Sequence, residues 1–529
     1  MKNKAIYPFI GATLIVIGIL LGLSLSREDI GGASSDKGKY EQKLADILNV
    51  LDKEYVDTVD KEKLFKETIT DLLHSLDPHS NYIPAEQLAR MNESIEGKFG
   101  GVGVRFTILR DTLNITNVIP SSPAFKVGIE KFDQIIEVND SLIAGVGLKN
   151  TDVQKLLKGQ EGTDVKVTIM RGNDRIQKTI TRGAVPIESI TAAYMISDDV
   201  GYIRLSQFSI QSANEFYVAA IKLKGQGMKK LIFDLRFNGG GVMGSAVSIA
   251  DMLLSVGKPI VSTKGKNNPE EVLKSQQPPL LGSTQLAVLI NGSSASASEI
   301  VAGALQDNDR GTIIGRRSFG KGLVQQDINL KDGSNLRLTV SRYYTPTGRS
   351  IQKPYAGNYE EYMMDEVNRY ENGELYELDS SLLLDSLKFI TPGGKIVYGG
   401  GGIMPDVFVP LDTVGGSTYL QRLRYSGVFN DFSYDFARNN KSLMNGFNSL
   451  DEFVRDFEVD EELLEYFLEY AKEHHDIQVN ESQFNKSLDQ VKETIKAEIA
   501  RQRWLEEGAY CVFNKTDKEV QIALEKLND

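Results

Sequence analysis

The chain has 529 residues, more than one hydrophobic core usually serves, so roughly three or four domains of about 100–200 residues are expected. Apolar residues make up 41% and charged residues 25% of the sequence, a globular composition that excludes a largely disordered, collagen-like or polytopic membrane protein. The net charge of −12 disfavours nucleic acid as a partner, and one cysteine with four histidines leaves few metal ligands, so we expect neither a metal nor another cofactor.

The first apolar segment, Ile6–Leu25, carries no charged residue over its twenty positions, enough for a helix to cross a hydrocarbon core of about 30 Å. Lys2 and Lys4 precede it and the segment after it contains acidic residues, so the positive-inside rule places the N-terminus in the cytoplasm. We therefore expect a single-pass anchor in the inner (cytoplasmic) membrane, with the remaining chain in the periplasm or otherwise outside the cytoplasm. A cleaved signal peptide is the alternative, with Ser24–Ser26 as a weak cleavage site.

Two amphipathic helices are expected after the Gly/Ser-rich tether at 31–38. Apolar residues recur at helical spacing over Leu44–Tyr55 and again over Leu64–Leu76. The second helix should end at Asp77-Pro78, because proline disfavours a helical conformation in the residue before it. The apolar faces of this tethered pair indicate self-association as a homodimer, and the alternative is that the pair packs on its own chain.

From about Lys98 to Arg182 the apolar period changes to two, which indicates a small β-rich domain. Glycine, asparagine and aspartate turns separate its short strands. The expected strands are Gly103–Ile108, Leu113–Val118, Gln134–Val138 and Val165–Met170.

A different pattern begins at Val200, where short apolar runs alternate with helical stretches. Each run is followed by a small-residue loop and then a helix, which predicts a parallel sheet with right-handed crossovers. The strands expected are Leu231–Leu235, Leu286–Ile290, Gly311–Gly315 and a later one at Leu336–Val340, with helices at Ser245–Leu254 and Ala297–Gln306.

Helical periodicity returns from Asn430 to the end of the chain. Apolar residues follow it over Phe453–Phe467 and over Val491–Ile499. Thr516 and Glu519 have the spacing of a capping box, which predicts the start of the last helix.

The serine-rich stretch Asn291–Glu299 follows an expected strand and opens an expected helix. A hydroxyl there faces unpaired backbone N–H groups and the positive end of the helix dipole, which stabilise a developing oxyanion. A serine of this stretch is therefore a candidate nucleophile. Serine at a helix start also serves simply as an N-cap, and this second interpretation stays open on the pattern alone.

A serine nucleophile needs a base, and histidine is the usual one. The four histidines lie outside the segment that holds the serines, and we expect surface or helix-terminal roles for them: His74, His79, His474 and His475. Lysine is the alternative base when burial lowers its pKa from about 10.4 toward neutrality. Lys321, which follows the strand expected beside the serine's helix, is the candidate, although a lysine between glycines also suits a solvated turn.

The stretch Gly315–Lys321 also fits the phosphate-loop pattern G-x-x-x-x-G-K. Gly322 stands where a serine or threonine should hold magnesium, and Leu323–Leu330 alternates like a strand instead of opening a helix. Both features disfavour a nucleotide site.

The serine and lysine stretches together resemble the active-site pair of the carboxy-terminal processing (tail-specific) serine proteases. The paired stretches are Ser294-Ala-Ser-Ala-Ser-Glu299 and Ser318-Phe-Gly-Lys-Gly-Leu-Val-Gln-Gln326. Three further stretches match that family: Gly201–Phe208, Asp234–Gly241 and Gly400–Asp406. The resemblance spans about residues 40–409 and leaves the C-terminal helices outside it.

The resemblance implies a Ser-Lys dyad in which Ser296 is the nucleophile, Lys321 is the base and Gln325 orients the lysine. It also implies an oxyanion hole that is made by the backbone N–H groups of Ala297 and Gly240, and glycine lets the backbone approach a substrate closely. Two further residues match family positions, and we assign them structural roles: Arg236 and Asp307.

The β-rich domain resembles a PDZ domain whose carboxylate loop is Gly101, Val102, Gly103 and Val104. Successive N–H groups in such a loop capture a free C-terminal carboxylate, and the adjoining strand edge accepts the tail as an added strand. An ordinary glycine hairpin is the alternative, and the pattern of Gln160–Thr163 with Val165–Arg171 favours the PDZ domain.

The whole chain is thus expected to be a multidomain α/β protein with a PDZ-like β-rich domain and a ClpP/crotonase-like α/β protease core. The expected function is that of a serine endopeptidase, a C-terminal processing peptidase whose substrates are protein or peptide C-terminal tails. The alternative is a catalytically inactive PDZ scaffold or adaptor on a protease-like fold. The expected segments are a membrane anchor or signal segment (1–26), an N-terminal helical region (27–95), a PDZ domain (96–183), a tail-specific protease core (184–412) and a C-terminal helical domain (413–529).

Overall fold

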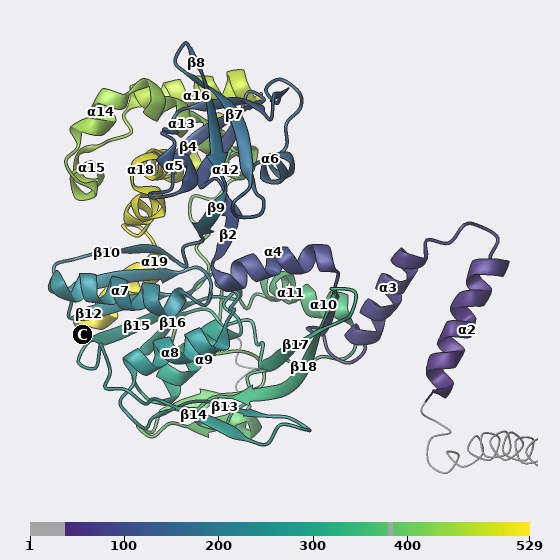
Figure 1. Ribbon diagram of the computed structural model, residues 1–529. Helices are drawn as coiled ribbons and strands as arrows, with labels where there is room; N and C mark the ends of the chain where they lie inside the picture. Colours follow the sequence, from purple (N-terminus) through teal and green to yellow (C-terminus); the bar gives the residue numbers. More distant parts are fainter. Residues whose placement is uncertain (1–37, 379–383) are drawn as a thin grey trace, which may run out of the picture. The chain divides into compact units, whose positions relative to one another are not determined.

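The computed structural model describes residues 38–378 and 384–529 (Figure 1). The expected membrane segment Ile6–Leu25 lies outside the described residues. Within the two described ranges, no helix combines the length and the apolar character needed to cross a membrane. The chain divides into two compact units, Met1–Ser75 and Leu76–Asp529.

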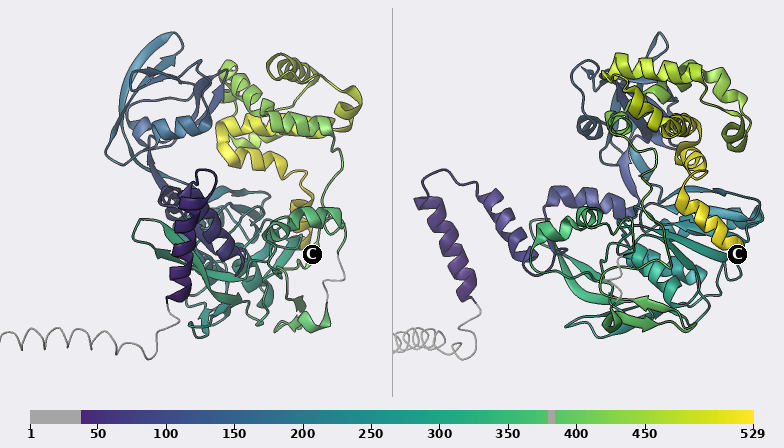
Figure 2. Two further views of the ribbon diagram at one scale, coloured as in Figure 1. Left: turned by 90° about the vertical axis from the view of Figure 1, so that its right-hand side faces the viewer. Right: turned by 180° about the vertical axis from the view of Figure 1, so that it is seen from behind.

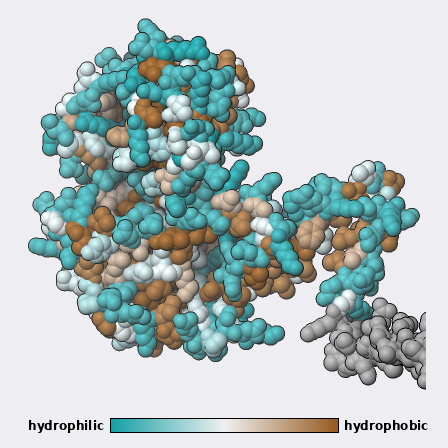
Figure 3. Space-filling model, viewed as in Figure 1, coloured by the Kyte–Doolittle hydropathy of each residue, from teal (hydrophilic) through white to brown (hydrophobic). Residues whose placement is uncertain are grey.

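The described part of the first unit contains two helices, α2 (Lys39–Glu54) and α3 (Lys61–His74), which confirms the expected pair. The carboxylate of Asp60 caps α3 by accepting a hydrogen bond from the N–H of Lys63, at 3.0 Å. Apolar residues remain exposed on both helices and are visible in brown in Figure 3. They include Leu44, Ile47, Val50, Phe65 and Leu72.

The β-rich domain forms one antiparallel sheet with the strand order β3-β4-β5-β7-β8. Its four expected strands are all present within about one residue of their expected bounds, because alternating side chains fill a core between the sheet and two helices. Strands β2 (Lys98–Gly101) and β9 (Gly183–Pro186) pair where the chain enters and leaves the domain. The other elements are β3 (Val104–Leu109), β4 (Thr112–Val118), α5 (Pro123–Lys126), β5 (Gln134–Val138), β6 (Ser141–Leu142), α6 (Asn150–Leu157), β7 (Asp164–Arg171) and β8 (Asp174–Thr181).

The α/β core contains a six-stranded sheet with the order β10-β11-β12-β15-β16-β21, in which the strands from β11 onward are parallel. The expected parallel sheet, with helices between its strands along the chain, is therefore confirmed. The sheet strands are β10 (Ile190–Met195), β11 (Val200–Leu205), β12 (Lys230–Asp234), β15 (Gln285–Ile290), β16 (Thr312–Gly315) and β21 (Val407–Phe408).

Both faces of this sheet are covered, so its strands are apolar on both sides. Phe233, Val288 and Ile313 lie side by side and face the helices α7 (Ser212–Gly225), α8 (Met243–Leu253) and α9 (Ala297–Asp307). The alternate residues, such as Ile232 and Leu289, face the last helix of the chain, α19 (Lys518–Asn528). Figure 1 shows the helices α7–α9 and α19 around this sheet.

A second sheet, which is antiparallel and has five strands, lies beside the first and supplies part of the site. Its strand β17 follows the candidate lysine directly, which confirms the strand expected there in place of a helix. The strands are β1 (Asn81–Ile83), β13 (Pro259–Lys264), β14 (Glu271–Lys274), β17 (Leu323–Asn329) and β18 (Asn335–Tyr344). The remaining elements before residue 400 are α4 (Ala85–Glu96), α10 (Tyr359–Met363), α11 (Asp365–Glu371), η2 (Asp385–Leu387), β19 (Lys388–Ile390) and β20 (Ile396–Tyr398).

The C-terminal helical region has an aromatic core of its own. The apolar run Phe453–Phe467 spans two helices, because Phe457 lies just after the end of the first. One detail of the sequence prediction is wrong there: Asp517 instead of Thr516 caps the last helix, because its carboxylate accepts the N–H groups of Glu519 and Val520. The helices before α19 are α12 (Thr418–Ser426), α13 (Val428–Asn439), α14 (Lys441–Gly446), α15 (Leu450–Asp456), α16 (Glu461–His475), α17 (Glu481–Lys486) and α18 (Leu488–Phe513).

This helical region contacts both the β-rich domain and the α/β core (Figure 2). Arg110, at the turn between β3 and β4, donates to both carboxylate oxygens of Asp435 on α13, at 2.9 and 3.1 Å. Non-helical backbone angles at Trp504 and Leu505 kink α18. The residues after this kink then pack on the six-stranded sheet of the core.

Candidate active site

The candidate nucleophile Ser296 lies on the turn between β15 and α9, with a backbone φ of +55°. This left-handed conformation is unusual for a residue with a side chain, and such strain is concentrated at functional sites. The flanking serines differ from it, because both are buried and bonded to the loop after β12. The hydroxyl of Ser294 donates to the carbonyl of Leu235 and that of Ser298 to the carbonyl of Asn238, each at 2.8 Å.

The candidate base Lys321 lies on the loop that joins β16 to β17. Its Nζ donates to Oε1 of Gln325 on β17, at 3.0 Å. Burial lowers the pKa of the Lys321 amine, and the positive charge of Arg337 lowers it further, while the carboxylates of Glu299 and Asp77 raise it. The expected cause of the shift, desolvation, is therefore the largest one.

One cavity of about 650 Å³ brings four of the expected residues together: Gly240, Ser296, Lys321 and Gln325. Ala297 adjoins it as the first residue of α9. In the described part of the chain, no hydrogen bond joins Oγ of Ser296 to Nζ of Lys321, and the amine is bonded to Gln325. Catalytic hydrogen bonds are often long before a substrate is bound, so this arrangement is compatible with a dyad.

The two expected oxyanion donors, the N–H groups of Ala297 and Gly240, differ in whether they already donate a hydrogen bond. Among the described residues, no acceptor is bonded to the N–H of Ala297, which is one of the unpaired N–H groups at the start of α9. The N–H of Gly240 instead donates to Oδ1 of Asn238, at 2.9 Å. Gly240 has a φ of +98°, and a Cβ built there would lie 2.8 Å from Cβ of Ser296, so only glycine fits beside the nucleophile.

A buried carboxylate that sequence reasoning did not assign, Glu299, joins the serine turn to the lysine loop. It accepts hydrogen bonds from the N–H groups of Ser296, Gly320 and Lys321, at 2.8, 2.7 and 2.9 Å, and from the hydroxyl of Ser318, at 2.5 Å. Burial raises its pKa, and these hydrogen bonds oppose that rise. The spacing Ser296-x-x-Glu299 is that of a capping box, and this pattern could have indicated the residue.

The expectation for His79 is wrong, because this histidine is half-buried beside the site. Its backbone carbonyl accepts a hydrogen bond from Nε2 of Gln325, and its ring Nε2 is bonded to the hydroxyl of Tyr362, at 2.9 Å. Burial and then the positive charge of Lys321 lower the pKa of His79 from 6.5 to about 3. The chain before β1 thus supports the lysine-orienting glutamine. The other histidines lie at helix ends, as expected: His74 on α3 and His474 and His475 on α16.

The expected carboxylate loop lies apart from the catalytic cavity, between β2 and β3. A Cβ built at Gly103 would lie 2.3 Å from Cβ of Ser122, and its φ is +82°, so the loop requires glycine there. In the hydrogen bonds of the described chain, the N–H groups of Val102 and Gly103 have no backbone or side-chain acceptor. Strand β3, which continues from this loop, is an edge strand of its sheet. The loop and the free strand edge are therefore adjacent.

The two residues expected to be structural are buried in ion pairs. Asp307 pairs with Arg349 at 2.7 Å, and Arg236 pairs with Asp234 at 2.7 Å.

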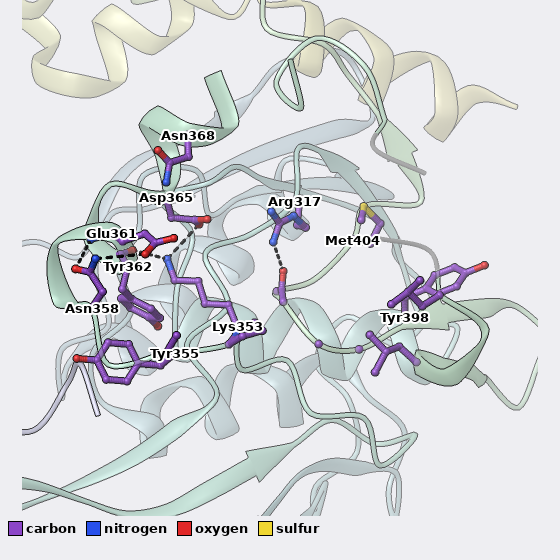
Figure 4. Close-up of a pocket in the computed structure, with 18 residues that line it drawn as sticks. Arg317, Lys353, Tyr355, Asn358, Glu361, Tyr362, Asp365, Asn368, Tyr398 and Met404 are labelled. Atoms are coloured by element: carbon purple, nitrogen blue, oxygen red, sulfur yellow. Dashed lines mark hydrogen bonds and ion pairs between the residues drawn. The ribbon is translucent and has the colours of Figure 1, made fainter. Parts of the chain in front are cut away.

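A second cavity, of about 500 Å³, lies over the other side of the lysine loop. Figure 4 shows the amine of Lys353 there, directed toward Asp365 at 3.1 Å and toward the ring of Tyr362.

Comparison with known proteins follows the same division of the chain. Residues 199–357 match the model of Peptidase family S41, residues 100–181 match that of the PDZ domain, and residues 419–505 match a family of unknown function (DUF8443). The chain is 36% identical over 361 residues to a carboxy-terminal-processing protease of Bartonella bacilliformis, covering 66% of this chain and 81% of that protein. It is 32% identical over 348 residues to a probable CtpA-like serine protease of Staphylococcus aureus, covering 65% and 69%. Among solved structures, a photosystem II D1 C-terminal processing protease aligns with 26% identity and a TM-score of 0.35, covering 69% of this chain and 91% of that one.

Proposed function

Because the chain belongs to the carboxy-terminal-processing proteases of peptidase family S41, we propose that it cleaves proteins near their C-termini with a Ser296–Lys321 dyad. One observation carries this proposal: the half-buried amine of Lys321, with its lowered pKa, shares a cavity with Ser296 and is held by Gln325. A lysine with a depressed pKa can act as a base at a pH at which an ordinary lysine stays protonated. We also propose a ClpP/crotonase-like fold for the core.

In the proposed reaction, the neutral amine of Lys321 accepts the proton of Ser296 Oγ while this oxygen attacks the carbonyl carbon of the peptide. The new C–O bond makes a tetrahedral intermediate, whose oxyanion accepts a hydrogen bond from the N–H of Ala297. Protonated Lys321 then gives its proton to the leaving amine as the C–N bond breaks. Water hydrolyses the remaining acyl-enzyme by the same proton transfers and restores Ser296.

The second oxyanion donor in this scheme is the N–H of Gly240. It serves only after it leaves Oδ1 of Asn238, so we propose that a bound substrate carbonyl replaces the Asn238 side chain.

The alternative function is an inactive PDZ scaffold, which needs no buried neutral lysine. Incubating the purified protein with peptides that differ only in their C-terminal residues separates the two functions, because a scaffold would bind these peptides and leave all of them intact.

Capture of tails by the PDZ domain predicts that a substrate with an amidated C-terminus is cleaved less efficiently at low concentration. The cause is that the N–H groups of the loop Gly101–Val104 lose their anionic partner. The measurement is kcat/KM for matched acid and amide peptides. Gly103→Ala should remove the difference by pushing on Ser122, whereas Gly128→Ala, at another glycine of positive φ that has open space around it, should keep it. Equal cleavage of the acid and amide forms by the unaltered protein would contradict tail capture.

We also propose a homodimer through the helices α2 and α3, whose exposed apolar residues a second copy would bury. Sedimentation of the chain from residue 27 on, with and without residues 40–76, tests the proposal. A dimer at micromolar concentration that becomes a monomer after the deletion is expected. Leu44→Glu with Ile47→Glu should have the same effect, and a monomeric intact protein would refute the dimer.

The segment Ile6–Leu25 is proposed as an anchor in the inner membrane, with the catalytic part in the periplasm or otherwise outside the cytoplasm. Its charge-free length supports this proposal. After cell fractionation, the full chain should stay with membranes through an alkaline wash, and added protease should reach it only from the outer side. Release of a shortened chain would support the signal peptide instead.

A further inference from the structure

The carboxylate of Glu519, at the start of α19, lies against the carboxyl-terminal ends of the core strands. Its side chain is buried, with an exposed fraction of 7%. One carboxylate oxygen contacts Nη1 of Arg236, and the other lies 2.6 Å from Nη1 of Arg316. A single carboxylate of the C-terminal region therefore binds two arginines of the α/β core.

These two arginines begin the two loops that carry the candidate catalytic groups. Arg236 follows β12 and precedes Gly240 by four residues, and Arg316 follows β16 and precedes Lys321 by five residues. Strand β15, which leads into the serine turn, lies between β12 and β16 in the sheet. Because the three strands are parallel, all three loops leave the same edge of the sheet. Glu519 spans this edge from the first loop to the third.

The rest of α19 fixes the position of this carboxylate. Val520 and Ala523 pack in one apolar cluster with residues of β12, β15 and β16. Asp517, the cap of the helix, also pairs with Arg236, at 2.8 Å. In the described part of the chain, Arg316 has only Glu519 as an ionic partner, and its Nη1 donates a hydrogen bond to the carbonyl of Val409, at 3.2 Å. Loss of the Glu519 charge would leave the Arg316 guanidinium, whose exposed fraction is 13%, without a counter-charge.

We propose that Glu519 is a positioning residue for catalysis, which holds the oxyanion loop through Arg236 and the lysine loop through Arg316. This inference rests on the proposed protease activity. The C-terminal helix is then part of the active-site support, although α19 follows the segment that matches the family of unknown function. Displacement of catalytic groups by about 1 Å can cost on the order of 10²-fold in rate, so the rate of the chemical step is the property that Glu519 should control.

Glu519→Gln in the full chain tests the proposal, because it removes the charge and keeps the shape of the side chain. Glu525→Gln, on the exposed side of the same helix, is the matched control. The measurements are kcat and KM for peptide cleavage, the rate of Ser296 labelling by a fluorophosphonate, and the affinity for a substrate tail. We expect kcat and the labelling rate to fall by about 10²-fold in Glu519→Gln, with KM and tail affinity within about twofold of the unaltered protein. Glu525→Gln should change none of them.

Arg316→Gln supplies a second test that does not alter α19. If both residues act through one ion pair, the double variant Arg316→Gln/Glu519→Gln should be no slower than the slower single variant. A folded Glu519→Gln protein with unchanged kcat, or losses that multiply in the double variant, would overturn the positioning role. If Glu519→Gln does not fold, full activity of Arg316→Gln overturns it. Absence of cleavage and of labelling in the unaltered protein would instead reject the proposed function.

Discussion

Replacing Ser296 with alanine is expected to abolish proteolysis and to leave tail binding intact. Removing the nucleophile of a serine protease can lower kcat on the order of 10⁶-fold. Ser296 is the N-cap of α9, and replacing such a serine with alanine costs about 0.5–2 kcal/mol, so the variant should stay folded with a free energy of unfolding lowered by about that amount. Cleavage of a tail peptide, binding of the same peptide and thermal unfolding of both proteins are the measurements.

The neighbouring serines provide controls of two kinds. Ser293→Ala removes a hydroxyl that donates to Glu366, at 3.3 Å near the surface, and should keep full activity. Ser294→Ala and Ser298→Ala should keep most activity, although each removes a buried hydrogen bond worth about 1 kcal/mol. If Ser296→Ala remained active while either flanking variant was dead, the nucleophile would be misassigned.

Much of this fold could be predicted from periodicity alone. The strands β12 and β15 were expected because short apolar runs before small-residue loops are typical of strands buried on both faces, and the structure buries both faces of that sheet. Ser296 and Lys321 were expected together because their stretches resemble one family, and the structure places both beside one cavity. Local pattern and family resemblance were sufficient for these features.

The contacts that the sequence did not reveal join segments far apart in the chain. The carbonyl of His79 supports Gln325, and Glu519 contacts Arg236, but neither pair shares a periodic pattern. Tertiary packing decides such contacts, and a pattern of apolar residues carries no information about them.

The base assignment predicts that activity rises with pH as Lys321 loses its proton. An ordinary lysine has a pKa of 10.5, and burial lowers the pKa of Lys321, so the rise should be centred below that value. Lys321→Arg should be as inactive as Lys321→Ala, because a guanidinium stays protonated. The positive charge of Arg337 also lowers the pKa of Lys321, so Arg337→Gln should move the rise toward higher pH and Arg337→Lys should not. The measurement is the pH profile of acylation.

A histidine base would also make activity rise with pH, but the rise would then depend on a histidine instead of Lys321. The His79 ring, with a pKa of about 3, is already neutral in the range where proteases work and does not titrate there. His79→Phe keeps the backbone carbonyl that Gln325 uses, so this variant and one without any histidine should keep the rise with pH. Loss of activity on replacing the His79 ring, together with an active Lys321→Ala, would replace the lysine by a histidine as the base. Because the ring is bonded to Tyr362 and the lysine to Gln325, we expect the profile to follow the lysine.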